Sequence, residues 1–259
     1  MSFFDKLRRP FVFAIVAAVV AQLHLSAPTK AEEVVKLAVG EWKPFISETL
    51  PEYGPVLEVV SRAFEIEGIK AEYTFLPWKR AMGMTRNGKF DGTPGWVFSD
   101  ERAVDFRYSD SLLTQRDQIF FHRDNPIEFE SAEDFSGMRT RILIGSYIGD
   151  EFAQLADRGQ LTIKESRSYV DMFKKLLRNK IDFLYLSEPV GAHVLNRELT
   201  KVQREQIVVK ESFRKPHEYH LLVSKQNENG LRVLRAFNSG LTKLKASGDY
   251  DRIIGKAHN

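Results

Sequence analysis

GKFDGTPGWVFSDERAVDFRYSDSL, residues 88–112, is the segment from which the organisation of this chain can be read. It runs from a turn through a short apolar strand to a small residue, Gly95, an indole, Trp96, and a polar loop at Ser99–Arg102. A guanidinium presents a rigid fork of donors that matches a carboxylate with two hydrogen bonds. Arg102 is therefore the leading candidate for holding a ligand, and a solvated surface charge is the alternative interpretation.

The chain around this segment alternates between strand and helix patterns. Short β-branched or aromatic runs indicate strands at 34–39, at 71–76 and from 90 onward. Apolar residues at helical spacing indicate helices at 55–68 and 77–87. The order strand–helix–strand–helix–strand predicts a parallel sheet whose strands are joined by helical crossovers.

The second half of the chain repeats this organisation. Its predicted strands and helices lie at 118–122, 140–144, 150–157, 161–165, 169–177, 181–186, 189–196 and 206–210, and the tail adds 220–224, 231–245 and 251–256. Each half contains a similar turn, RNGKFD ending at Asp91 and RNKID ending at Asp182, in which a helix passes into a strand. We therefore predict an α/β protein with one lobe formed by 32–117 and 221–259 and another formed by 118–220.

The first 31 residues have the composition of a secretory signal peptide. Basic residues precede an apolar run at 11–25, and cleavage is expected after Ala31. The run is shorter than the about 20 residues that span a membrane, which favours a cleaved signal peptide. An uncleaved membrane anchor is the alternative. The sequence thus predicts export to the periplasm. Because the chain contains no Cys, it is not expected to be a lipoprotein or to contain disulfides.

The basic character of the chain belongs to this leader. The sequence has 38 Lys and Arg and 35 Asp and Glu, and the leader contains four of the former and one of the latter, which leaves 34 of each. A chain without net charge does not favour nucleic acid or an anionic membrane as a partner.

Sequence motifs for catalysis and cofactors are not found. The chain has no phosphate loop, no Gly-x-Ser-x-Gly and no Cys nucleophile. His217 and His220 have the spacing closest to a zinc site, but on a predicted crossing strand they are expected to be structural. We therefore expect no catalytic residue, no metal and no cofactor.

An ordered set of motifs resembles one known family. It begins with the leader and Gly40–Phe45 (GEWKPF), continues through the 88–112 segment and Asn179–Asp182, and ends with Ser247–Tyr250 (SGDY). Over residues 33–257 the chain resembles the family 3 extracellular solute-binding proteins, which include the periplasmic binding proteins for polar amino acids. The resemblance implies a type II periplasmic-binding-protein fold of two α/β lobes joined by two crossing strands, which traps a small molecule and presents it to an ABC permease.

The resemblance also assigns ligand contacts by position. Arg102 takes the place of the Arg that holds the ligand carboxylate, and Ser99 takes the place of the Thr in the family's T-x-x-R step. Trp42 matches an aromatic that packs on the ligand. A helix start in the second lobe, which donates hydrogen bonds to the carboxylate, is matched by Gly145, Ser146 and Tyr147.

Further candidates lie beside predicted strand ends, outside which ligands of open α/β sheets bind. Trp78, Gly95 and Trp96 are placed near the ligand in this way, with core packing as the alternative for each Trp. Arg80 is a candidate second anion donor, or else part of the solvated face of its helix.

The sequence departs from the family at two places. Gly95-Trp96-Val97 stands where relatives present hydroxyl donors, and the acidic residue that takes the ligand α-amino group falls on Ser187, with Glu188 next to it as the substitute. These departures concern the part of the site that would receive an α-amino group, so the expected ligand is a small carboxylate-bearing solute, an amino acid or a close analogue, and need not be a standard α-amino acid.

Three hypotheses for the function follow. The first is a monomeric periplasmic protein that captures a small carboxylate-bearing solute for an ABC transporter. The second is a module that reports its ligand to a membrane receptor. The third is a dehydratase-like periplasmic enzyme of the same fold, with Glu188 as its acid.

Overall fold

The structure of this chain is a computed structural model that describes residues 33–258, and the residues from Val34 onward belong to one compact unit. The signal peptide expected at 1–31 lies outside the described residues. Within residues 33–258, no helix combines the length and the apolar character that crossing a bilayer requires.

Most of the helices and strands lie close to the predicted ranges, whereas the strands at 106–108 and 113–115 and the helices at 100–105 and 201–204 were not predicted. The strands are β1 (Glu33–Val39), β2 (Ile69–Phe75), β3 (Thr93–Val97), β4 (Phe106–Tyr108), β5 (Leu113–Gln115), β6 (Asp117–His122), β7 (Arg139–Leu143), β8 (Thr162–Ser166), β9 (Phe183–Ser187), β10 (Ile207–Glu211) and β11 (His217–Ser224). The α-helices are α2 (Pro55–Ile66), α3 (Trp78–Arg86), α4 (Asp100–Asp105), α5 (Asp150–Asp157), α6 (Tyr169–Leu176), α7 (Glu188–His193), α8 (Lys201–Arg204), α9 (Gly230–Ala246) and α10 (Asp249–Ile254). Short 3-10 or π turns occupy 51–53, 132–135, 194–198 and 255–258.

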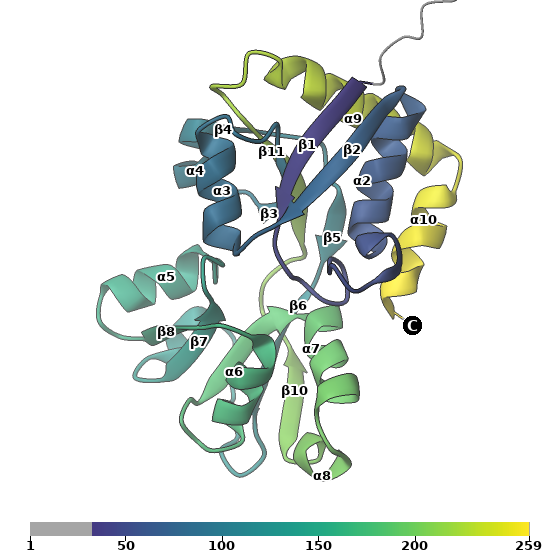
Figure 1. The fold of residues 1–259 in the computed structure, drawn as a ribbon. Coiled ribbons are helices and arrows are strands. Elements are labelled where there is room, and N and C mark those ends of the chain that lie inside the picture. Colours follow the sequence, from purple (N-terminus) through teal and green to yellow (C-terminus); the bar gives the residue numbers. More distant parts are fainter. Residues whose placement is uncertain (1–32, 259) are drawn as a thin grey trace, which may run out of the picture. The chain divides into compact units, whose positions relative to one another are not determined.

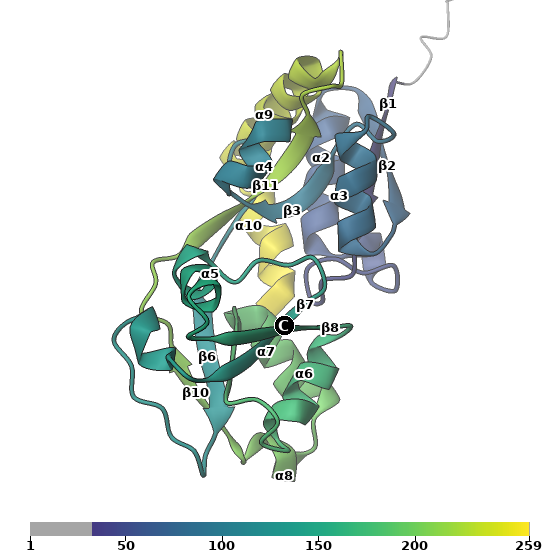
Figure 2. The ribbon, with the colours of Figure 1, turned by 90° about the vertical axis from the view of Figure 1, so that its left-hand side faces the viewer.

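These elements form two groups (Figures 1 and 2). The β11 group contains β1–β5, β11, α2–α4, α9 and α10, and the β6 group contains β6–β10 and α5–α8. In the β11 group, β11 pairs antiparallel with β3, β4 and β5. β1 pairs with β2 and is joined by a parallel bridge from Leu37 to Gly92 just before β3. The predicted parallel order thus holds between β1 and this segment, whereas the strand that returns from the tail is antiparallel.

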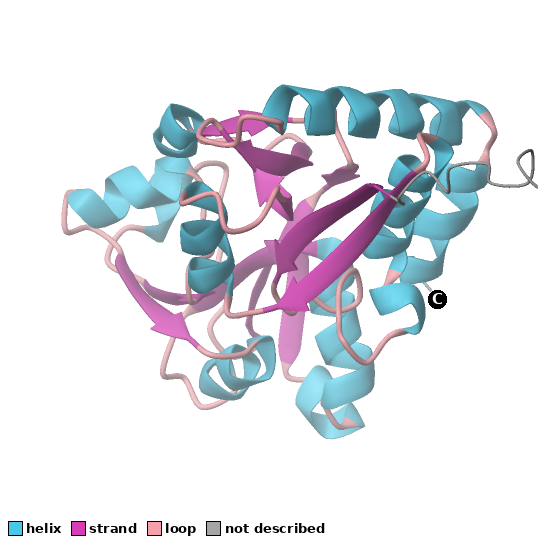
Figure 3. Ribbon diagram, turned by 45° about the horizontal axis from the view of Figure 1, so that its top comes forward, coloured by secondary structure: helices cyan, strands magenta, loops and turns pink. Residues whose placement is uncertain are grey.

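In the β6 group, β6 lies between β10 and β9 and is antiparallel to both, while β7 and β8 are parallel. β9 is buried on both faces. Phe183 packs with Phe152 in one hydrophobic cluster, and the next residue, Leu184, packs with Phe173 in another. Alternate residues of a strand point to opposite faces, so a strand covered by helices on both sides reads as a continuous apolar run. Figure 3 shows the helices outside the strands.

The turn that occurs twice in the sequence makes the same hydrogen bonds in both groups. The Asp91 carboxylate accepts the backbone N–H of Lys36 in β1 at 2.8 Å, and the Asp182 carboxylate accepts that of Arg139 in β7 at 2.7 Å. In return, each Asp donates its own N–H to the carbonyl of the same residue. Each aspartate therefore fastens the start of one strand to its neighbour.

Replacing Asp182 with asparagine is expected to lower the free energy of unfolding by about 1–3 kcal/mol, because the charged hydrogen bonds from Arg139 are lost. Burial disfavours the ionised carboxyl, but the hydrogen bonds from Arg139 outweigh it and hold the pKa of Asp182 below its usual value. The carboxylate therefore stabilises the fold above its unfolded pKa of about 3.9, and this contribution is lost as the pH falls through the folded pKa.

Urea unfolding of both proteins at neutral and at acid pH measures this effect. The difference in stability between wild type and Asp182→Asn should shrink at the lower pH, and a difference that stays constant would contradict the assignment.

Candidate functional site

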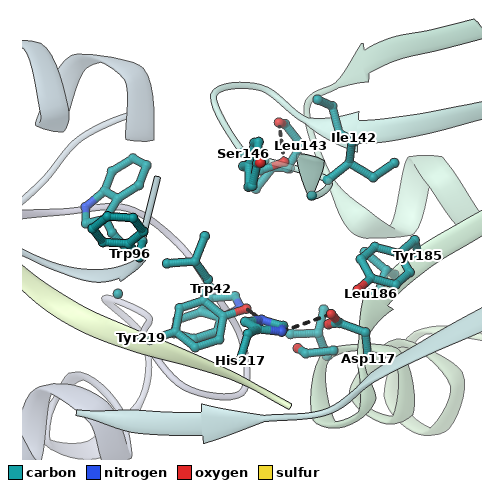
Figure 4. Close-up of a pocket in the computed structure, with 18 of the residues that line it drawn as sticks. Trp42, Trp96, Asp117, Ile142, Leu143, Ser146, Tyr185, Leu186, His217 and Tyr219 are labelled. Carbon is teal, nitrogen blue, oxygen red and sulfur yellow. Dashed lines mark hydrogen bonds and ion pairs between the residues drawn. The ribbon is translucent and has the colours of Figure 1, made fainter. Parts of the chain in front are cut away.

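A cavity of about 540 Å³ lies between the β11 group and the β6 group, within the usual size range of small-molecule sites. Its lining comes from the β3–α4 segment, the loop after β7, the end of β9 and the two segments that cross between the groups. Figure 4 shows that indole, phenol, imidazole and carboxylate groups face this space.

Arg102 reaches this cavity from α4. Its guanidinium carbon lies 5.0 Å from the centre of the Trp96 ring and 5.6 Å from that of the Tyr147 ring, and its Nη1 donates to the Val97 carbonyl at 3.2 Å. Burial lowers the pKa of Arg102 because the charged form has lost part of its hydration. Among residues 33–258, no carboxylate is within ion-pair distance of this guanidinium. A desolvated cation without a carboxylate partner is an arrangement suited to binding an anion.

The Ser99–Arg102 step begins a helix and is not the loop expected from the sequence. Ser99 Oγ accepts the backbone N–H of Arg102 at 3.3 Å as the N-cap of α4, and Asp100 and Glu101 occupy the first turn. A hydroxyl cap and acidic residues both stabilise a helix N-terminus. The helix therefore fixes the backbone from which the Arg102 side chain extends.

The three tryptophans of the chain all line the cavity. Trp42 and Trp96 are almost fully buried, Trp78 is partly exposed, and the rings of Trp78 and Trp96 meet edge to face at 5.1 Å. Gly95 has a positive φ of 94°, and a Cβ there would lie 3.4 Å from Trp78 and 3.6 Å from Trp42. The positive φ accounts for the glycine, and the indoles of Trp78 and Trp42 pack beside it.

The loop after β7 contributes the predicted residues Gly145, Ser146 and Tyr147. They are not the helix start that the sequence predicted, because α5 begins only at Asp150, after the N-cap Gly149. Arg214 packs against Gly149, where a Cβ would lie 2.0 Å from its Nη1, and the first turn of α5 is acidic. Arg214 and the acidic residues of the first turn therefore lie at this helix end.

Arg80 and Glu188 do not line this cavity. Arg80 is exposed on α3. Glu188 begins α7 and faces a second cavity, together with Glu58 and Lys256, whereas the preceding Ser187 lines the first. One step along an extended chain turns the side chain to the opposite face. The acid expected to receive a ligand amino group is therefore directed away from Arg102.

A buried carboxylate in the cavity was missed by sequence reasoning. Asp117, at the start of β6, is 7% exposed, and its Oδ2 lies 3.0 Å from Nδ1 of His217, at the start of β11. The other ring nitrogen of His217 is 3.1 Å from the Tyr219 hydroxyl (Figure 4). His217, expected to be structural, thus faces the cavity. No sequence signal marked this pair, because its members meet only through the pairing of the crossing segments.

Tyr185 and Arg214 are two further polar side chains beside Asp117 in the cavity. Burial and the negative charge of Asp117 raise the pKa of Tyr185, so the phenol stays protonated. Its hydroxyl accepts from Arg214 Nη1 at 3.4 Å, and Arg214 Nε lies 3.3 Å from a Glu151 carboxylate oxygen. Within residues 33–258, no three His, Asp or Glu side chains are grouped as a metal site would require.

Comparison with known sequences gives one family. The model described as bacterial extracellular solute-binding proteins, family 3, matches residues 40–258. No curated protein sequence matches the chain.

Solved structures resemble this chain at low sequence identity. An ancestral arginine-binding protein bound to arginine has a TM-score of 0.73 at 19% identity, over 87% of this chain and 98% of that one. A histidine kinase sensor domain with similarity to periplasmic binding proteins has 0.70 at 20%, over 85% and 95%. AbpA from Streptococcus pneumoniae, an amino acid ABC transporter substrate-binding protein bound to L-arginine, has 0.68 at 17%, over 86% and 94%. The predicted type II periplasmic-binding-protein fold is confirmed.

Proposed function

This chain belongs to the bacterial extracellular solute-binding proteins of family 3, and from that membership we propose that it captures a small carboxylate-bearing solute for an ABC permease. The proposed solute is an amino acid or a close analogue, and the protein acts as a monomer in the periplasm after loss of its leader. One observation carries the proposal. The partly buried Arg102 guanidinium, stacked between Trp96 and Tyr147, has no carboxylate partner among residues 33–258.

The mechanism follows from the origin of these side chains. We assign the two lobes to 32–117 with 221–259 and to 118–220. Arg102 and Trp96 then belong to the first lobe and Tyr147 to the second, so a ligand held by Arg102 is within reach of both. Such a ligand binds the closed form better than the open form and shifts the equilibrium between them, while the crossing segments absorb the motion.

Calorimetric titration with matched pairs of ligands tests this proposal. Each pair consists of an amino acid and its amide, for example L-arginine and L-argininamide, in which the carboxylate is replaced by a neutral group. We expect an acid to bind and its amide to bind at least about tenfold more weakly, because only the carboxylate satisfies the Arg102 fork. Equal binding of both members, or no binding of any amino acid or organic acid, would refute a carboxylate site.

A receptor role is the second candidate, favoured by the similarity to a histidine kinase sensor domain. The two roles differ in what the loaded protein does to its membrane partner. Stimulation of ATP hydrolysis by a reconstituted ABC permease would establish transport. A loaded protein that leaves the permease unchanged and instead alters the phosphorylation of a sensor kinase would establish the receptor role.

Enzymatic turnover is the least supported alternative, because its expected acid, Glu188, faces the second cavity. A binding protein returns its ligand unchanged. Mass spectrometry of the ligand after long incubation with the protein distinguishes the two, since a dehydratase product is lighter by one water.

A further inference from the structure

We propose that Asp117 binds a second, cationic end of the ligand: a guanidinium or primary ammonium remote from the carboxylate at Arg102. This inference rests on the proposed function, because it concerns the other end of the same molecule. It identifies the ligand as a long dipolar compound with an N–H-bearing cation. It also assigns the cation to the crossing segment, and not to Glu188 or Ser187 at the end of β9.

The Asp117 carboxylate is the main observation. Its side chain is 5% exposed, and Oδ2 is buried and accepts no hydrogen bond from residues 33–258. His217 Nδ1 is 3.0 Å from Oδ2 but is not aligned as a hydrogen-bond donor, so the contact is only an ion pair when the imidazole is protonated. A buried carboxylate oxygen without a donor is unfavourable. A ligand N–H that reaches the cavity at this point removes that cost.

The cations around Asp117 are engaged elsewhere. Arg214 pairs with Glu151 through Nε and donates from Nη1 to Tyr185. The second nitrogen of His217 contacts the Tyr219 hydroxyl. Neither side chain therefore supplies the hydrogen bond that Oδ2 lacks, and the nearby Arg214 charge is offset by its own carboxylate partner.

The surroundings of Asp117 are aromatic and suit a flat or compact cation. Tyr185 and Tyr219 line the same cavity, and the Tyr219 ring lies 4.6 Å from that of Trp42. Aromatic faces attract cations. The unsatisfied oxygen adds a second requirement, since only a cation with N–H groups can donate to it and a quaternary ammonium cannot. The two requirements together favour a cation that carries N–H groups, such as a guanidinium or a primary ammonium, over a quaternary ammonium.

The location of the two charges indicates that this cation is remote from the ligand carboxylate. Figure 4 shows Asp117 and Trp96, the ring beneath Arg102, on opposite sides of the cavity. The α-ammonium of an amino acid is attached to the carbon next to its carboxylate. A molecule that contacts both Arg102 and Asp117 therefore carries its second charge at the far end of a chain.

The test compares L-arginine with L-citrulline, which has the same length and the same α-groups but a neutral ureido group in place of the guanidinium. In calorimetry, we expect wild type to bind L-arginine at least about tenfold more tightly than L-citrulline. Asp117→Asn, which keeps the shape and removes the charge, is expected to weaken L-arginine binding about thirtyfold or more and L-citrulline binding by less than about threefold. Asp182→Asn lowers stability away from the cavity and should leave both affinities unchanged.

Three results would overturn the assignment of Asp117. These are equal affinity of wild type for L-arginine and L-citrulline, an equal loss for both in Asp117→Asn, and binding of Nε-trimethyl-L-lysine as tight as that of L-lysine. A wild-type protein that binds other carboxylates but none of these cationic ligands would likewise overturn it while leaving the carboxylate site intact. Failure of the carboxylate site itself is recognised separately, by unchanged binding in Arg102→Ala.

Discussion

Arg102→Ala is expected to weaken binding of a carboxylate ligand by roughly 30-fold to 5,000-fold, which corresponds to about 2–5 kcal/mol for removing one side of a buried charged hydrogen bond. The wild-type guanidinium is already desolvated and stacked on Trp96, so a ligand carboxylate meets an oriented donor. Alanine leaves the carboxylate buried without a partner. Calorimetry with the best-binding acid of the ligand panel measures the loss.

Two further variants sharpen this result. Arg102→Lys keeps the charge but loses the planar fork and its stacking, so binding about tenfold weaker than wild type is expected. Arg80→Ala removes an exposed guanidinium of the neighbouring helix α3 that does not line the cavity, and it should bind like wild type. If Arg80→Ala lost as much affinity as Arg102→Ala, the site would be centred on α3 and not on α4.

Gly240→Ala is expected to destabilise the fold by about 3 kcal/mol or more, because it overpacks a helix crossing that cannot adjust by a side-chain movement. Gly240 lies within α9, and a Cβ there would come 1.8 Å from the Ala63 carbonyl oxygen in α2. The contact is with backbone, so the two helices have to separate, and the Phe64–Phe237 ring contact beside it would loosen. For a unit of this size, the midpoint of thermal unfolding should fall by roughly 6–12 °C.

Gly83→Ala in α3 is the matched control. Apart from the neighbouring residues and the backbone of its own helix, no atom lies within 4 Å of the position that a Cβ would take there, so only the helix preference of alanine acts. This variant should unfold at the same temperature as wild type or be stabilised by up to about 1 kcal/mol. A Gly240→Ala protein with the stability of Gly83→Ala would show that α2 and α9 do not pack as closely as the structure places them.

Local signals explain why so much of the fold could be predicted. The repeated turn ending at Asp91 and Asp182 contains a helix end, a residue suited to positive φ and an acid that binds the adjacent strand. Gly88 and Asn179 take the same place in the two turns, with φ of 72° and 53°. Glycine and asparagine are the residues that adopt this conformation most readily. The sequence signal for each turn is therefore contained in at most six consecutive residues.

The parts of the site that could not be predicted depend on contacts between distant segments. Whether Ser187 or Glu188 faces Arg102 is decided by a single step at the end of β9. Asp117 meets His217 because β5 pairs with the start of β11, and the register of such a long-range pair is not encoded locally. The helix at α4, by contrast, was readable from Ser99 and its acidic neighbours, and the loop interpretation was wrong.

The position of Asp117 and His217 on the crossing segments has a mechanical meaning. If the proposed lobes rotate about the crossing segments, these residues lie at the hinge, where displacement is smallest, whereas Arg102 and Tyr147 lie on the moving lobes. A ligand contact at the hinge would be made to nearly the same extent in the open and closed forms. Such a contact would select among ligands without favouring closure. In that case ligand selectivity and lobe closure depend on different side chains. Substitutions of Asp117 or His217 at the hinge would then change which ligands bind, while the closing motion that a membrane partner senses would be preserved.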